Sequence, residues 1–227
     1  MSTLKQLIVI GILVVSSVSL QAQELLTSPA FFDQVAQRYG TIEDYTADVV
    51  ISNENTVSRG VLFFRAPNMV RIDFEVPSEQ IIVSDGKRLQ VFIPRYNVVL
   101  SQELRQRSDE SLASFASEQG LRLLRQNYSI AYLDSPGMVP LDPQSDVMVT
   151  KLRLNWRNST EGYRQLVLSI DGDMVIRRIS GVTADYREVQ FDFRNVQLNT
   201  GIPESRFDYR GPASANTVHD FLFEREG

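Results

Sequence analysis

The stretch from Arg59 to Val99 constrains the fold of this chain more than any other. Apolar runs of strand length are separated there by Pro67, Pro77 and the Asp85-Gly86 pair, which end strands or supply the positive φ angle of a tight hairpin. Between Met69 and Val76, apolar and charged residues alternate, so one face of that strand is apolar and the other is charged. The stretch therefore predicts a meander of antiparallel strands.

Similar strand patterns precede and follow this meander. One run covers Tyr45 to Ser52, and later runs cover 147–156, 164–170, 174–182, 187–198 and 207–209. The count predicts about ten strands, together with two or three short helices. Because the strands follow one another as hairpins, we expect an α+β fold whose curved antiparallel sheet forms an incomplete, half-open β-barrel. The tail from 214 to 227 shows no strand pattern.

Two segments have helical character. Ser28-Pro29 is a typical helix start, and Phe32 and Val35 begin an apolar stripe that ends at Gly40. Residues 108–128 form an insertion between strands, in which Gly120 is expected to end a first short helix. Such an insertion over the mouth of a sheet is typical of a mobile lid, although an ordinary helix that closes the core permanently would show the same pattern.

Residues 1–22 are predicted to be a signal peptide that is cleaved after Ala22. Lys5 precedes an apolar run from Leu7 to Val15. The run is shorter than the roughly 20 residues that cross a bilayer, so an uncleaved anchor is the weaker alternative. We expect residues 23–227 to form one domain. The chain contains no cysteine and therefore no disulfide.

Catalytic and cofactor motifs are not apparent. A Ser-His-Asp or Cys-His catalytic site needs a histidine, and the only histidine is His219, which lies among polar residues near the C-terminus. The sequence therefore does not indicate such a site. Ser84-Asp85-Gly86-Lys87 lies between strands and reads as a hairpin rather than a phosphate loop. We therefore expect no enzyme activity, no cofactor and no metal site. A net charge of −5 without a block of lysine or arginine argues against nucleic acid as a partner.

Several motifs together resemble the LolA family, the periplasmic carriers of outer-membrane lipoproteins. They are Gly60 beside an aromatic strand, Ala66-Pro67-Asn68, Arg71-Ile72-Asp73, the run from Ile82 to Leu89, the run from Phe191 to Val196, Ile202-Pro203, and Phe207-Asp208-Tyr209. The hairpin run from Ile82 to Leu89 is the most specific of them. The resemblance covers most of residues 23–227 and implies a half-barrel whose apolar interior holds the acyl chains of a lipoprotein.

The resemblance implies a carrier that works without catalysis and as an expected monomer. Its partners would be lipoproteins, the inner-membrane ABC transporter that releases them, and an outer-membrane receptor lipoprotein. Two alternatives remain open. One is a lipid-sensing or lipoprotein-sensing regulatory module similar to RseB, which shares the half-barrel, and the other is a hydrolase with an unusual site.

Candidate acyl-chain contacts follow from the predicted concave face, the first helix and the lid. They are Val70, Ile72, Phe74, Ile82, Leu89, Val91, Ile93, Phe32, Val35, Leu112, Phe115, Leu121 and Leu124. Members of the family often carry an arginine directly before the proline of the first long strand, where it holds the lid shut. Ala66 occupies that position here, so the neighbouring Arg65 is the candidate latch although it would point to the opposite face.

Overall fold

The computed structural model describes residues 26–104, 117–157 and 162–221. The predicted signal peptide, residues 1–22, lies outside these ranges. The α-helices are α1 (Ser28–Tyr39) and α2 (Glu118–Asn127), and the 3₁₀ helices are η1 (Pro94–Tyr96) and η3 (Glu204–Phe207). The strands are β1 (Asp44–Asn53), β2 (Val57–Arg65), β3 (Met69–Val76), β4 (Ile81–Ser84), β5 (Arg88–Ile93), β6 (Val98–Glu103), β7 (Tyr128–Tyr132), β8 (Val139–Pro140), β9 (Met148–Trp156), β10 (Tyr163–Ile170), β11 (Ile176–Thr183), β12 (Glu188–Leu198) and β13 (Asn216–His219).

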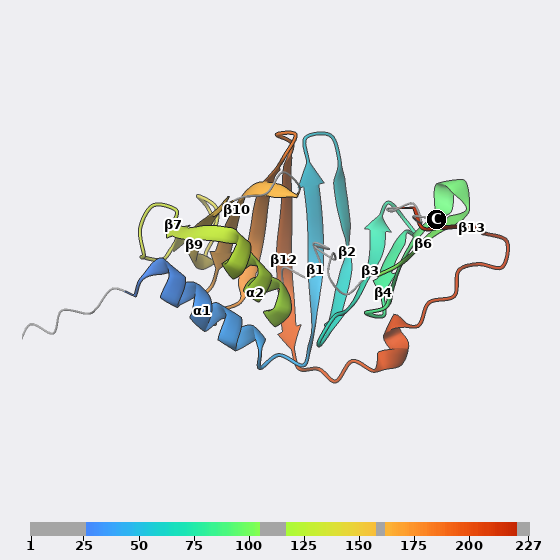
Figure 1. Ribbon diagram of the computed structural model, residues 1–227, viewed down its shortest axis with the longest axis horizontal. Coiled ribbons are helices and arrows are strands. Elements are labelled where there is room, and N and C mark those ends of the chain that lie inside the picture. The colour runs from blue at the N-terminus through green and yellow to red at the C-terminus, as the bar shows by residue number, and fades with distance from the viewer. Residues whose placement is uncertain (1–25, 105–116, 158–161, 222–227) are drawn as a thin grey trace, which may run out of the picture.

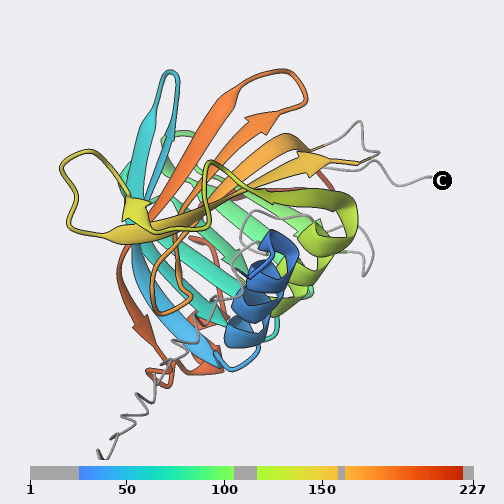
Figure 2. The same cartoon turned by 90° about the vertical axis from the view of Figure 1, so that its left-hand side faces the viewer.

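One curved sheet contains all 13 strands of the described ranges. Its order is β13-β6-β5-β4-β3-β2-β1-β12-β11-β10-β9-β7, with β8 paired to β9. Every pairing is antiparallel except that of β13 with β6. The sheet curls without closing, and Figure 2 shows the helices lying at its open side. The predicted α+β half-barrel is confirmed, with more strands than the predicted count of about ten.

Two glycines allow the meander to form. At Gly60 in β2, an added Cβ would lie 2.3 Å from the backbone oxygen of Asp73, so only glycine permits the close approach of β3. Gly86 has a φ of +85° in the β4–β5 hairpin, which confirms the positive φ predicted for that turn. The carboxylate of Asp85 accepts hydrogen bonds from the backbone N–H groups of Lys87 and Arg88 and holds the same turn.

The helices lie against one half of the sheet. In Figure 1, α1 and α2 lie in front of its left half, while β3 to β6 extend to the right beyond them. The Thr27 side chain accepts a hydrogen bond from the Ala30 N–H, so Thr27 rather than Ser28 caps α1. Ser117 caps α2, and Gly120 lies in the first turn of α2, so the prediction that Gly120 ends a helix was wrong. Neither helix in the described ranges is long and apolar enough to span a membrane.

The main core lies between the helices and the concave face. Phe32 and Val35 of α1 and Leu121 and Leu124 of α2 are buried there against side chains from most of the long strands. A smaller cluster lies on the opposite, outer face, where Ile202 and Phe207 pack on Val83. This second cluster is made by the C-terminal segment (residues 201–215), which runs along the underside in Figure 1 toward β13.

The structure corrects three expectations about strands. The run 207–209 is not a strand, because Phe207 is the last residue of η3. Its two alternating aromatic residues, Phe207 and Tyr209, pack onto the outer face of the sheet. The tail was expected to lack a strand, but Asn216–His219 pairs with β6 as β13. Strand β7 was not predicted because it follows α2 directly, at Tyr128.

Candidate functional site

The strands β3 to β6 present two different faces. Cross-strand partners lie on the same face of a sheet, and the register joins Ile72 to Ile82, Ile82 to Val91, and Val91 to Leu100. Since Ile72 belongs to the main core, this row faces the concave side. The row forms a continuous apolar line across four strands.

The predicted acyl contacts fall into three groups. Seven lie in the main core, each at most 8 % exposed: Phe32, Val35, Val70, Ile72, Phe74, Leu121 and Leu124. Four lie on the concave side of β4 and β5 and are half-buried: Ile82, Leu89, Val91 and Ile93. Leu112 and Phe115 lie outside the described residues. The structure thus separates a packed interior from a partly open apolar strip.

Two residues of that strip escaped prediction. Val98 pairs with Ile93 and Leu100 pairs with Val91, and both are half-buried. Their alternation with the buried Val99 was visible in the sequence, but the run Asn97-Val98-Val99-Leu100 has no charged residue to show which face is which. We call the half-buried set the apolar wall. It consists of Ile82, Leu89, Val91, Ile93, Val98 and Leu100.

Helix α2 packs against α1 and β7 and contributes to the main core. Its buried residues are Gly120, Leu121 and Leu124. Arg125 forms an exposed ion pair with Asp33 of α1, with 3.1 Å between Nε and Oδ1. Exposed pairs of this kind contribute about 0 to 1 kcal/mol. The position of α2 therefore depends mainly on the burial of its two leucines.

Arg65 lies on the outer face of β2. Its Nη1 donates a 2.6 Å hydrogen bond to the backbone oxygen of Ile202 in the C-terminal segment. On the same face, Arg71 donates to the Arg206 carbonyl, and Arg206 pairs with Asp73. The contact described for Arg65 is thus with the C-terminal segment rather than with α2, and its role as a latch stays a prediction.

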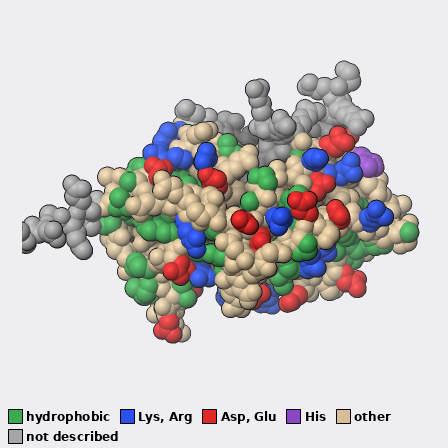
Figure 3. Space-filling model, turned by 90° about the horizontal axis from the view of Figure 1, so that it is seen from below, with side chains coloured by type: hydrophobic (Ala, Val, Ile, Leu, Met, Phe, Trp, Pro, Cys, Tyr) green, Lys and Arg blue, Asp and Glu red, His purple; other side chains and the backbone are tan. Residues whose placement is uncertain are grey.

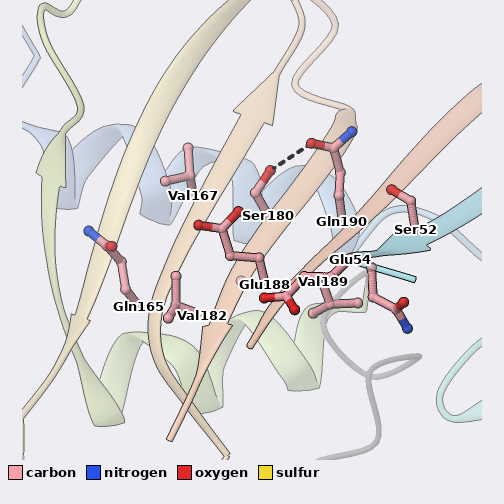
Figure 4. A pocket seen from close by; sticks show the side chains of 11 residues that line it. Ser52, Glu54, Gln165, Val167, Ser180, Val182, Glu188, Val189 and Gln190 are labelled. Carbon is pink, nitrogen blue, oxygen red and sulfur yellow. Dashed lines mark hydrogen bonds between the residues drawn. The ribbon is translucent and has the colours of Figure 1, made fainter. Parts of the chain in front are cut away.

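A hollow of about 410 Å³ lies on the outer face of β1 and β10 to β12. Figure 4 shows its side chains on the side of the sheet away from the helices, with Ser180 hydrogen-bonded to Gln190. Gln165, Glu54 and Glu188 add further polar groups to its lining. Because amides and carboxylates lose hydration when covered by hydrocarbon, this hollow is poorly suited to an acyl chain.

Three tyrosines in the main core or packed against it have a raised pKa. Burial raises the pKa of Tyr39 and of Tyr45, and it raises the pKa of Tyr163 to about 12. Burial therefore favours the neutral form of all three hydroxyls. Within the described ranges, no group of three or more His, Cys, Asp or Glu side chains could hold a metal ion. On the face seen in Figure 3, acidic and basic side chains are interspersed rather than gathered by sign.

Comparison with known proteins identifies a family that matches most of the described chain. Residues 48–210 match the family model described as "Outer membrane lipoprotein carrier protein LolA". A protein of that name from Azotobacter vinelandii is 25% identical over 164 residues, which cover 71% of this chain and 72% of that protein. One from Bordetella avium is 24% identical over 186 residues, covering 81% and 83% respectively.

Solved structures share the fold at lower identity. An uncharacterized conserved protein from Thermus thermophilus superposes with a TM-score of 0.55 and 13% identity, covering 83% of this chain and 96% of that one. MucB in the Pseudomonas aeruginosa MucA/MucB complex gives 0.52 and 13%, covering 84% and 63%. The Mycobacterium tuberculosis lipoprotein LppX gives 0.50 and 14%, covering 79% and 97%. These likenesses establish the half-barrel architecture.

Proposed function

We propose that this chain, which belongs to the LolA family of outer membrane lipoprotein carrier proteins, holds the acyl chains of lipoproteins on its concave face and carries them through the periplasm. The observation that carries the proposal is the apolar row from Ile72 to Leu100, which continues from the packed core onto half-buried strands. The carrier binds its cargo without a catalytic step.

The free-energy cost of removing an acyl chain from a membrane determines how much apolar burial the concave face must provide. Withdrawing hydrocarbon from a membrane costs about 0.8 kcal/mol per CH₂, so a chain of about sixteen carbons needs roughly 12 kcal/mol of compensating burial. The packed core cannot admit such a chain as it stands, because Leu121 and Leu124 are 0 % and 2 % exposed. The apolar wall is the accessible part of the same surface.

Binding then has two stages. An acyl chain first lies along the apolar wall, where Val91 and its neighbours are half-buried. Deeper burial requires α2 to move away from the core, which exposes Leu121 and Leu124 and leaves their places to the acyl chain. Because both exchanged surfaces are apolar, the exchange costs little net free energy. Helix α2 lies within residues 108–128, the segment for which a lid was predicted, and the proposal assigns it that role.

The proposed partners follow from this route. Lipoproteins reach the carrier from a releasing ABC transporter in the inner membrane, and a receptor at the outer membrane accepts them. A co-purification from cells with the wild-type chain, followed by mass spectrometry of the captured proteins, would identify both. A regulatory module that binds a signalling protein is the second candidate, because the fold is shared with MucB, a protein solved in complex with MucA.

Extraction of a lipopeptide from vesicles tests the proposal. The protein is incubated with vesicles that carry a fluorescent triacylated lipopeptide, the vesicles are pelleted, and the supernatant is analysed by size exclusion and mass spectrometry. We expect a soluble complex that contains unaltered lipopeptide. Lipopeptide that stays entirely in the pellet contradicts the proposal, and release of free fatty acid supports the hydrolase instead.

A further inference from the structure

The last strand of the sheet differs from the others. Among the described residues, β13 is the one strand that pairs in parallel, and it lies at the end of the sheet along the edge of β6 that no other strand occupies. All four of its residues are exposed, with Val218 at 46 %. Its pairing thus rests on the backbone, including the Asn216 N–H bond to the Asn97 carbonyl and the Asp220 N–H bond to the Ser101 carbonyl. A short, exposed, parallel pairing is weak.

The C-terminal segment (residues 201–215), which precedes β13, is held much more firmly. Ile202 and Phe207 are 6 % and 2 % exposed on the outer face. The buried carboxylate of Asp44 accepts hydrogen bonds from the backbone N–H groups of Thr200, Gly201 and Ile202. Strand β13 can therefore leave β6 while the segment before it stays in place.

The register places β13 at the end of the apolar row. Val218 is the partner of Leu100, and Leu100 is the partner of Val91. From Val218 to Ile72 the row crosses four strand spacings, or about 19 Å. An acyl chain in a bilayer spans about 15 Å, half the hydrocarbon thickness of roughly 30 Å. A chain attached at the Val218 position could therefore lie along the row without leaving the sheet.

We propose that the edge of β6 is a peptide-binding site at which the extended N-terminal segment of a lipoprotein replaces β13. The acylated residue takes the register position of Val218, and its acyl chains run along the apolar row toward Ile72. The peptide is recognised through backbone hydrogen bonds, which suits cargoes of different sequence. The inference rests on the proposed function and deepens it by naming the part of the cargo that the edge binds.

A reversible disulfide can hold β13 in place. The chain has no cysteine, and Ser101 is the register partner of His219 on the outer face, away from the apolar wall. The double variant Ser101→Cys/His219→Cys would be measured oxidised and reduced, with Ser101→Cys as the control. Two probes are compared, a triacylated cysteine and the same group joined to an unstructured peptide.

We expect oxidation to weaken binding of the triacylated peptide at least tenfold and to change binding of the triacylated cysteine less than twofold. Equal affinity of the oxidised and reduced forms for the triacylated peptide would overturn the inference while leaving the proposed function intact. If neither probe binds in any form, the proposed function fails, and this inference fails with it.

A truncated chain gives an independent test. Ending the chain at Ala213 removes β13 and keeps Ile202 and Phe207 on the outer face. We expect at least threefold tighter binding of the triacylated peptide and unchanged binding of the triacylated cysteine. If the truncated chain instead dimerises without gaining affinity for the peptide, the edge of β6 joins two copies of this chain, and the inference is wrong.

Discussion

The guanidinium of Arg65 reaches the backbone oxygen of Ile202, at 2.6 Å, across the outer face of β2. This contact ties a strand of the half-barrel to the C-terminal segment, and it lies on the side of the sheet away from α2. If Arg65 were instead a latch, its loss would free the lid. The two roles predict different behaviour for one substitution.

Arg65→Ala should lower the free energy of unfolding by about 1.5 to 3 kcal/mol, because a half-buried charged hydrogen bond is lost. Chemical denaturation measures the change, and the exposed Arg59→Ala on the same strand is the control, with an expected change below about 0.5 kcal/mol. The rate at which a fluorescent fatty acid binds should stay within twofold of the wild type. A marked increase in that rate would instead support the hypothesis that Arg65 holds the lid shut.

Asp44 is the second anchor of the C-terminal segment. It is 2 % exposed, and its carboxylate accepts hydrogen bonds from three successive backbone N–H groups, from Thr200 to Ile202. Asp44→Asn would turn an NH₂ group toward donors, so we expect a loss of about 3 kcal/mol in the free energy of unfolding. Thermal and urea unfolding would show it, against Asp208→Asn on the exposed part of the same segment. A change below about 1 kcal/mol would rule out this anchoring role.

Tyr39 makes stability depend on alkaline pH. Burial raises its pKa, although the Ile176 N–H that donates to its oxygen lowers it in part. Because the folded pKa lies above the unfolded value of about 10, the contribution of Tyr39 is complete below about pH 10 and is lost as the pH rises beyond it. Tyr39→Phe should cost about 1 to 2 kcal/mol at pH 7, since the Ile176 N–H loses its partner.

Comparing pH 7 with pH 11 isolates the titration of Tyr39. The fall in unfolding free energy between these pH values should be smaller in Tyr39→Phe than in wild type by about 1.4 kcal/mol. The 65 % exposed Tyr96 supplies the control, and Tyr96→Phe should leave the fall unchanged. An identical fall in Tyr39→Phe and wild type would show that the Tyr39 hydroxyl titrates normally.

Most strands of the sheet could be predicted from the sequence, because apolar and polar residues alternate along them. The run Tyr45 to Ser52 was predicted from apolar alternation and extends by one residue at each end, as β1. Strand β13 carried no such signal, since backbone bonds hold it and its four side chains are exposed. Phe207 and Tyr209 gave a false strand signal, because packing on the outer face also produces alternation.

The candidate site was predictable in part for the same reason. Periodicity identified Val70, Ile72 and Phe74 as one face, and the structure places all three in the core. Periodicity could not distinguish a packed interior from a half-buried wall, since that depends on where α1 and α2 end over the sheet. The outer position of the Arg65 contact likewise depends on a segment more than a hundred residues later in the chain.

The central claim is that acyl chains bind the concave side of β4 to β6, and adjacent residues of β5 test it most directly. Val91 and Gln90 are both half-buried, but Val91 faces the concave side and Gln90 pairs with Val83 on the outer side. Each is changed to glutamate, and affinity for the triacylated peptide is measured by fluorescence titration beside a check of folding by circular dichroism. The account predicts that Val91→Glu weakens binding at least tenfold and Gln90→Glu less than twofold. Equal effects of the two substitutions on a folded protein would contradict it.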